Sequence, residues 1–221
     1  SMADSMDAGG PGGQGGEPEE DEQEWSEAPT GTQGGASDKQ ADNKFLGLKE
    51  RRKSSIIKMF LGDYLRPVTN ATVLRLLAKN GDRQVIFADF AVKVNRRNKM
   101  QKRVLLLSDT ALYNLDPRSY RCKRRVPLQI LGGISMSSLS DNFFALHVPT
   151  EYDYLMVSAK KIEITTHVMQ AYQTLLRSPL PINISNSFDY RIDADTIREI
   201  KFSKVEGGVS TQIFTKSVDR G

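Results

Sequence analysis

The stretch QVIFADFAVKVNRRNKMQKRVLLLSD, residues 84–109, decides the fold class of this 221-residue chain. Its first half alternates with a period of two, so one strand face carries five apolar residues: Ile86, Ala88, Phe90, Val92 and Val94. Asp89 and Lys93 fall on the opposite face. A second apolar run, VLLLSD, follows a short basic connection, and the whole stretch therefore predicts two antiparallel strands joined by a hairpin.

The connection between these strands concentrates positive charge. Residues 93–103 hold six basic side chains and no acidic one: Lys93, Arg96, Arg97, Lys99, Lys102 and Arg103. Like charges repel, so this loop is costly unless water, salt or an anionic partner takes up the charge. A solvated hairpin tip is one interpretation. We favour contact with an anionic membrane, where each Lys or Arg near the surface contributes about 1 kcal/mol.

The flanking sequence extends this pattern in both directions. Residues 43–67 mix apolar and basic side chains at helical spacing, and Asn70 is placed to cap a second helix closed by Gly81. Further short strands follow to residue 158, then an amphipathic helix at 162–176 and more strands to 217. We expect an α+β, mainly β fold, an antiparallel barrel or sandwich capped by this helix, with helices before it and extra strands after it.

Charge divides the chain into two parts. Residues 1–44 contain eleven Asp and Glu against two Lys, a net charge of −9, whereas the remainder holds 29 basic and 16 acidic residues, a net of +13. The first part is rich in Gly, Pro and Glu and cannot bury enough surface to fold, so we expect a disordered acidic tail at 1–44 and one domain at 45–221. We take Met2 as the native start. This tail either competes with anionic lipid for the basic surface or is an inert solubilising segment.

Several function classes lack support in the sequence. A single cysteine, Cys122, excludes an internal disulfide framework and favours a reducing cytoplasm, and no apolar run reaches membrane-spanning length. His147 and His167 have no neighbours at metal-ligand spacing, and no nucleophile–base arrangement can be argued. We therefore expect no metal, no cofactor and no enzyme activity.

Three strings resemble the tail homology domain of class I myosins: FLGDYL at 60–65, IFADFAVKVNRR with KRVLLLSD at 86–109, and GISMSSLSDNFFALHV at 133–148. The resemblance covers roughly residues 45–215. It implies a pleckstrin-homology-like core that binds anionic phosphoinositides, in a family where this domain follows a motor and a calmodulin-binding neck. The sequence has no Gly-Lys-Ser/Thr phosphate loop and no neck motif, so we expect a tail-type protein without a motor.

The resemblance also implies site residues. The family pattern places one basic residue at the end of the first core strand and another at the start of the next, which are Lys93 and Arg103 here. A tyrosine on the third strand, Tyr113, is a weaker transfer from pleckstrin-homology sites.

A second basic cluster comprises Arg121, Lys123, Arg124 and Arg125. It either faces the same membrane or is an ordinary basic edge strand. Cys122 lies among these cations, which should favour its thiolate. Ser54 follows two arginines in a form that basophilic kinases accept.

Three functions compete. The leading one is a phosphoinositide-binding, peripheral membrane module that is monomeric and cytoplasmic. The alternative is an adaptor whose basic surface binds an acidic cytoskeletal protein. Nucleic-acid binding is disfavoured, because the basic segments lack the interleaved aromatic residues of single-strand binders.

Overall fold

A computed structural model describes residues 60–217 of the chain. The acidic tail predicted at 1–44, most of the helix predicted at 43–66, and Ser54 lie outside the described residues. The described strands are β1 (Val85–Val94), β2 (Met100–Ser108), β3 (Ala111–Leu115), β4 (Cys122–Pro127), β5 (Gly133–Met136), β6 (Phe143–His147), β7 (Tyr154–Val157), β8 (Ile182–Ile184), β9 (Ser187–Arg191), β10 (Thr196–Val205) and β11 (Gly208–Ser217). The helices are η1 (Pro67–Thr69), α2 (Ala71–Asn80), η2 (Leu128–Ile130) and α3 (Lys161–Leu176).

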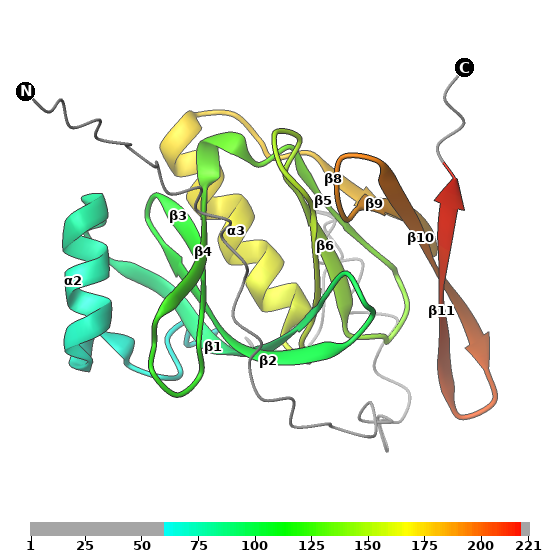
Figure 1. Ribbon diagram of the computed structural model, residues 1–221, viewed down its shortest axis with the longest axis horizontal. Coiled ribbons are helices and arrows are strands. Elements are labelled where there is room, and N and C mark those ends of the chain that lie inside the picture. Colours follow the sequence, from blue (N-terminus) through cyan, green and yellow to red (C-terminus); the bar gives the residue numbers. More distant parts are fainter. Residues whose placement is uncertain (1–59, 218–221) are drawn as a thin grey trace, which may run out of the picture.

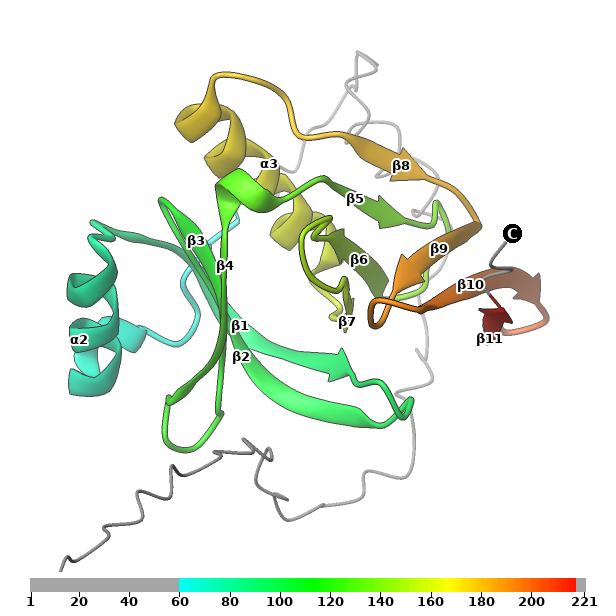
Figure 2. The same ribbon diagram turned by 45° about the horizontal axis from the view of Figure 1, so that its top comes forward.

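Eight strands form one bent sheet in the order β4-β3-β2-β1-β7-β6-β5-β8. Strands β1–β4 and β5–β7 are two antiparallel meanders, joined where β1 pairs with β7. The prediction of a mainly β, pleckstrin-homology-like fold with a following helix is confirmed. A closed barrel is wrong, because β4 and β8 end the order without pairing to each other. Figure 2 shows α3 lying in the angle between the two halves of the sheet.

The concave side of this bend holds the main core. Phe87, Ala91, Leu105 and Met156 pack there with the apolar stripe of α3, centred on the fully buried Val168. The helix predicted from the apolar period at 162–176 is confirmed as α3. Since α3 buries its apolar stripe against both halves of the sheet, it fixes the angle between them.

The convex side of β1–β3 is covered by α2, as Figure 1 shows. Asn70 caps this helix by accepting from the backbone N–H of Thr72 at 2.8 Å, and Gly81 ends it in the left-handed region at φ 73°. Both caps agree with the sequence prediction. Val73 and Leu77 bury the inner face of α2 against a second core behind β1–β3.

The prediction that five apolar residues share one face of β1 is only partly correct. A register shift between Val85 and Phe87 breaks the alternation, so Ile86 packs on the concave core with Phe87. Ala88 lies on the convex side under α2, but Phe90 lies beyond that helix and is 40% exposed. Because β1 is covered on both sides near its start, a simple alternation of apolar and polar residues does not identify its core face.

Residues 60–66 are not helical, contrary to the prediction of a helix that ends just before Pro67. Asp63 instead bridges to Ala88 of β1. Gly62 adopts φ 75°, and its N–H donates to the buried carboxylate of Glu163 on α3 at 3.1 Å. Contacts to β1 and α3 therefore override the helical spacing of the sequence, which is a local signal only.

A second sheet of three strands, β11-β10-β9, forms from the predicted C-terminal strands. Phe188, Ile200 and Phe202 pack its inner face against Ala145 and Leu155, on the convex side of β6 and β7. The small sheet thereby lies beside the β1–β2 hairpin, which extends toward it in both views.

Candidate functional site

Strand register brings Lys93 and Arg103 to the concave side near the β1–β2 hairpin. Lys93 lies opposite Gln101, and Arg103 lies opposite the core residue Ala91. Paired residues share a face of the sheet, so both cations project to the same side as the core. The structure thus brings together the two cations that the family resemblance paired.

Two tyrosines and a third cation complete this group. Arg124 on β4 lies opposite Asn114, on the concave face, and its guanidinium carbon is 3.8 Å from the ring centre of Tyr152 and 4.4 Å from that of Tyr154. Lys93 Nζ lies 5.8 and 5.3 Å from the same two ring centres. We call the five residues the concave cluster: Lys93, Arg103, Arg124, Tyr152 and Tyr154. Contact with the rings holds Lys93 and Arg124 at defined positions without neutralising their charge.

Two arginines of the concave cluster, Arg103 and Arg124, each have an N–H group without a hydrogen-bond acceptor in the described residues. The Arg124 side chain is only 9% exposed; it donates from Nε and Nη2 to Glu151 and from Nη2 to the carbonyl oxygen of Tyr152. Its buried Nη1, and the buried Nε of Arg103, make no hydrogen bond within the described residues. Buried N–H groups without an acceptor are costly, and an anion would satisfy them once a side-chain movement exposes them.

The β1–β2 loop is held in one conformation by its own turn and by the small sheet. Asn95 accepts from the N–H groups of Arg97 and Lys99 at 2.8 and 2.9 Å, and Asn98 takes φ 60°. From β10, the nearly buried Arg198 donates to Asn98 Oδ1 at 2.5 Å and to the carbonyl oxygen of Arg96 at 2.6 Å. These hydrogen bonds fix the backbone of the loop, and therefore the positions from which its basic side chains extend.

The other basic side chains of the loop differ in position: one lies beside the concave cluster, and the others lie away from it. The guanidinium of Arg96 lies 5.6 Å from the Tyr152 ring centre, beside the concave cluster. Arg97 and Lys99 are exposed at the tip, and Lys102 lies on the convex side with its ammonium 4.3 Å from the ring centre of Phe90. Only Arg96 among these adds to the concave cluster.

Tyr113 does not belong with these residues. It lies opposite Leu106 on the convex face, fully buried under α2. Its hydroxyl donates to the buried carboxylate of Asp82 and accepts from Arg125 Nε at 2.9 Å. Burial, together with the hydrogen bond to Asp82, raises the pKa of Tyr113. The predicted contribution of Tyr113 to the concave site is therefore wrong, because adjacent positions on β3 face opposite sides of the sheet.

The carboxylate of Asp82 is the centre of a structural network. Besides Tyr113, it accepts from the hydroxyls of Thr110 and of Ser108, the latter at 3.0 Å, and its side chain is fully buried. Arg125 Nη2 lies 3.9 Å away. This network ties the end of α2 to β2–β4, so we assign Arg125 to the support of the fold.

The second basic cluster is therefore divided by strand alternation. Arg124 joins the concave cluster, whereas Arg125 and Cys122 point to the convex side. Arg121 and Lys123 lie at and after the β3–β4 turn. Burial raises the pKa of the Cys122 thiol, against the opposing effects of the Arg124 N–H and the charge of Arg125. The expectation of a favoured thiolate is wrong, because half-burial outweighs the neighbouring charge.

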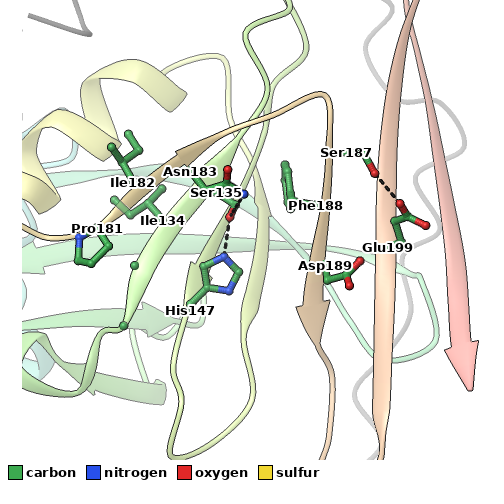
Figure 3. Close-up of a pocket in the computed structure, with 12 residues that line it drawn as sticks. Ile134, Ser135, His147, Pro181, Ile182, Asn183, Ser187, Phe188, Asp189 and Glu199 are labelled. Atoms are coloured by element: carbon green, nitrogen blue, oxygen red, sulfur yellow. Dashed lines mark hydrogen bonds between the residues drawn. The ribbon is translucent and has the colours of Figure 1, made fainter. Parts of the chain in front are cut away.

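A pocket of about 650 Å³ lies elsewhere, between the convex face of β5 and β8 and the edge of the small sheet (Figure 3). Its walls are formed by β5 and β8 on one side and by β9 and β10 on the other. Residues on its walls include Ser135, His147, Asn183, Phe188, Asp189 and Glu199. Lys216 Nζ donates to both carboxylate oxygens of Asp189, at 2.7 and 2.9 Å, so this acidic wall already holds a cation.

The pocket floor carries a relay that resembles a catalytic triad. The Ser135 hydroxyl lies 2.7 Å from His147 Nε2, and His147 Nδ1 lies 3.1 Å from Asp153. Although burial opposes it, hydrogen bonds from His147 and from two backbone N–H groups hold the pKa of Asp153 below its usual value. Yet Ser135 is 2% exposed and accepts from Asn183 at 3.3 Å. We interpret the relay as a cross-strand brace rather than a nucleophilic site.

Sequence reasoning missed the two tyrosines and Arg198. The string EYDYLMVS carried a signal, because Tyr152 and Tyr154 are two positions apart on one face of an extended segment. No local signal marks Arg198, which reaches the loop across about one hundred residues. In residues 60–217 no group of three or more His, Cys, Asp or Glu side chains is placed to hold a metal ion, and no helix is long and apolar enough to cross a membrane.

Comparisons with known proteins give one family. Residues 51–220 match the model described as "Unconventional myosin tail, actin- and lipid-binding". The chain is similar to the myosin ID heavy chain of Dictyostelium discoideum, 35% identical over 73% of this chain and 15% of that protein. It is also similar to unconventional myosin-Ia of Bos taurus, 29% identical over 77% of this chain and 17% of that protein.

Among solved structures, the N-terminal pleckstrin-homology domain of human ARAP2 aligns with 40% of this chain and 79% of that chain, at a TM-score of 0.33 and 13% identity. The chain spans 15% to 18% of the length of five curated myosin relatives that it matches.

Proposed function

The chain belongs to the unconventional myosin tail family, and we propose that its domain is a non-catalytic, peripheral membrane-binding module that holds a phosphoinositide headgroup at the concave cluster. The family description names lipid as a ligand. It does not name the lipid or the residues. The proposal concerns this domain alone and not the activity of the longer relatives.

One observation carries the proposal. Arg103 and Arg124 each keep a buried N–H without a hydrogen-bond acceptor in the described residues, beside Lys93 on the same face. A phosphomonoester brings about −1.5 to −2 charges and three acceptor oxygens, which suits a group of convergent N–H donors. Arginine binds such oxygens through a planar fork, which gives a fixed orientation as well as attraction.

The exposed cations of the loop serve a different purpose. Arg97 and Lys99 at the tip, and Lys102 on the convex side, contribute attraction to any anionic surface, at about 1 kcal/mol each before screening. Met100 beside them is 40% exposed and can enter the interfacial layer. The loop thus supplies general affinity for anionic membranes, and the concave cluster supplies recognition of the headgroup.

The test compares two substitutions that remove the same charge. Arg103→Ala removes a cluster cation, and Arg97→Ala removes a tip cation. We expect Arg103→Ala to lose about 10- to 100-fold affinity for vesicles containing phosphatidylinositol 4,5-bisphosphate, the range for one charge-assisted interaction. It should lose only a few fold on vesicles with phosphatidylserine of equal charge. Arg97→Ala should lose a few fold on both.

Melting temperatures of both variants serve as the folding control. If the two variants lose the same affinity on both kinds of vesicle, the concave cluster does not recognise the headgroup. If the wild-type chain binds neither vesicle at low salt, membrane binding itself is refuted.

A second function, binding to a cytoskeletal protein, has one observation in its favour, since the family description also names actin. Actin is acidic, and the basic hairpin would bind it largely through charge. Co-sedimentation with filaments tests this proposal directly. Competition by headgroup-containing vesicles would show whether one surface serves both partners.

A further inference from the structure

We propose that Glu151 competes with the ligand of the concave cluster. Its carboxylate binds the Arg124 guanidinium until a phosphorylated headgroup displaces it. The inference rests on the proposed function, and it adds a residue that sets the threshold for binding. It concerns the connection between β6 and β7, which the sequence did not mark as part of a site.

The Glu151–Arg124 pair has the geometry of an occupied anion site. One carboxylate oxygen, Oε2, accepts from Arg124 Nη2 at 2.7 Å and from Nε at 3.1 Å. An anion therefore already uses two of the N–H groups that a headgroup phosphate would use. The pair is unequal in burial, because the Arg124 side chain is 9% exposed and that of Glu151 is 44% exposed.

The two side chains of the pair differ in how many contacts hold them. Arg124 is fixed by two aromatic rings and by the carbonyl oxygen of Tyr152, and these contacts remain if the carboxylate leaves. The backbone of Glu151 is also fixed, because its carbonyl oxygen accepts from Arg191 and its N–H donates to the carbonyl oxygen of Val148. Only the half-exposed carboxylate is able to turn into solvent. The arginine is thus a preformed receptor, and the carboxylate is an exchangeable ligand.

The Glu151 carboxylate and a headgroup phosphate differ in charge and in number of oxygens. A carboxylate brings one negative charge, and it leaves Arg124 Nη1 and Arg103 Nε without an acceptor in the described residues. A phosphomonoester carries up to twice that charge and a third oxygen, and it has no tether that restricts it to one arginine. Weak anions should therefore fail to displace Glu151, whereas a polyphosphorylated headgroup should succeed.

The experiment removes the competing charge without changing its shape. Glu151→Gln is compared with Glu206→Gln, which removes the same charge from the exposed turn between β10 and β11. Two probes separate the sources of phosphate: vesicles containing phosphatidylinositol 4,5-bisphosphate and soluble inositol 1,4,5-trisphosphate. Vesicles with phosphatidylserine alone report general attraction to an anionic surface.

We expect Glu151→Gln to raise affinity about fivefold over Glu206→Gln for both the vesicles and the soluble headgroup, near the upper end for a partly exposed ion pair. On phosphatidylserine vesicles the two variants should be equal. In an Arg124→Ala background the gain from Glu151→Gln should vanish, because the competitor then has nothing to occupy.

Three results would overturn the inference while leaving the proposed function intact. They are equal affinity of Glu151→Gln and Glu206→Gln for the headgroup, a gain of the same size on phosphatidylserine, and a gain that persists without Arg124. Failure of the wild-type chain to bind any of the probes would instead refute the proposed function.

Discussion

Arg198→Lys should loosen the β1–β2 loop without changing the charge of the protein. Arg198 donates from two different nitrogens to two acceptors in the loop, Asn98 Oδ1 and the carbonyl oxygen of Arg96. A lysine ammonium lacks the planar fork and cannot reach both acceptors in this geometry. The loop then loses these two hydrogen bonds to β10 and keeps the hydrogen bonds of its own turn.

The expected size of the effect follows from the lost contact. Arg198 is 9% exposed, so at least one charged hydrogen bond is lost where water replaces it poorly. Such a bond contributes about 2 kcal/mol, which corresponds to about a 30-fold change in the equilibrium between closed and open loop.

Amide hydrogen exchange measures this opening directly. The N–H groups of Asn95 and Asn98 are hydrogen-bonded inside the loop, at 2.9 and 3.0 Å, and should lose about 30-fold in protection. Amides of the paired strands β2 and β3 serve as the internal control and should not change. Affinity for headgroup-containing vesicles should fall a few fold, because releasing the Arg96 backbone lets its guanidinium leave its position beside Tyr152 of the concave cluster. Unchanged protection at Asn95 and Asn98 would refute the idea that the small sheet supports the loop.

Two further predictions concern the free energy of unfolding. Asp82→Asn should lower the free energy of unfolding, measured in urea, by about 3 kcal/mol, because a carboxamide cannot accept from three hydroxyls at once. Asp109→Asn, at a partly exposed carboxylate, is the control. Equal losses in the two variants would contradict the stabilising role of the Asp82 network. Asp153→Asn should cost about 1 to 3 kcal/mol at pH 7. The pKa of Asp153 is lowered in the folded state, so its contribution is present above the ordinary value of 3.8 and is lost as pH falls below it. The gap between wild type and Asp153→Asn should therefore narrow in acid, and a gap that widens there would contradict the assignment.

Local signals predicted much of the fold. Asn70 and Gly81 fix the ends of α2 through their own side chain and backbone conformation, and the apolar period of α3 is visible in the sequence. Such features depend on residues within one or two turns. The apolar face of β1 depends instead on which helices cover each side of the sheet. The position of Phe90 could not be predicted for that reason.

The candidate site was predicted in part. Lys93 and Arg103 came from a family pattern, and strand pairing places them on one face as that pattern requires. Tyr113 was misplaced because a transfer by strand number ignores which side a residue faces. Arg124 was recognised only as a member of a basic cluster, since its alternation with Arg125 becomes visible once the β3–β4 register is known.

The partners of Arg124 come from a distant part of the chain. Glu151 and Tyr152 reach it across about 27 residues, through the joining of the two halves of the sheet at β1 and β7. No periodicity or spacing encodes such a contact. The same holds for Glu163, which is buried on α3 and fastens Gly62 at the start of the described chain.

The central claim is that a phosphorylated headgroup binds on the concave side of the β1–β2 hairpin. Titration of the isotopically labelled protein with soluble inositol 1,4,5-trisphosphate, followed by NMR, tests it most directly. We expect the largest chemical-shift changes at the backbone amides of Lys93, Arg103 and Tyr152 and at the side-chain Nε of Arg124. The chemical shifts of amides around Ser135 in the pocket should not change. Saturable shifts confined to the pocket or to the tip residue Arg97, with none at the concave cluster, would contradict it.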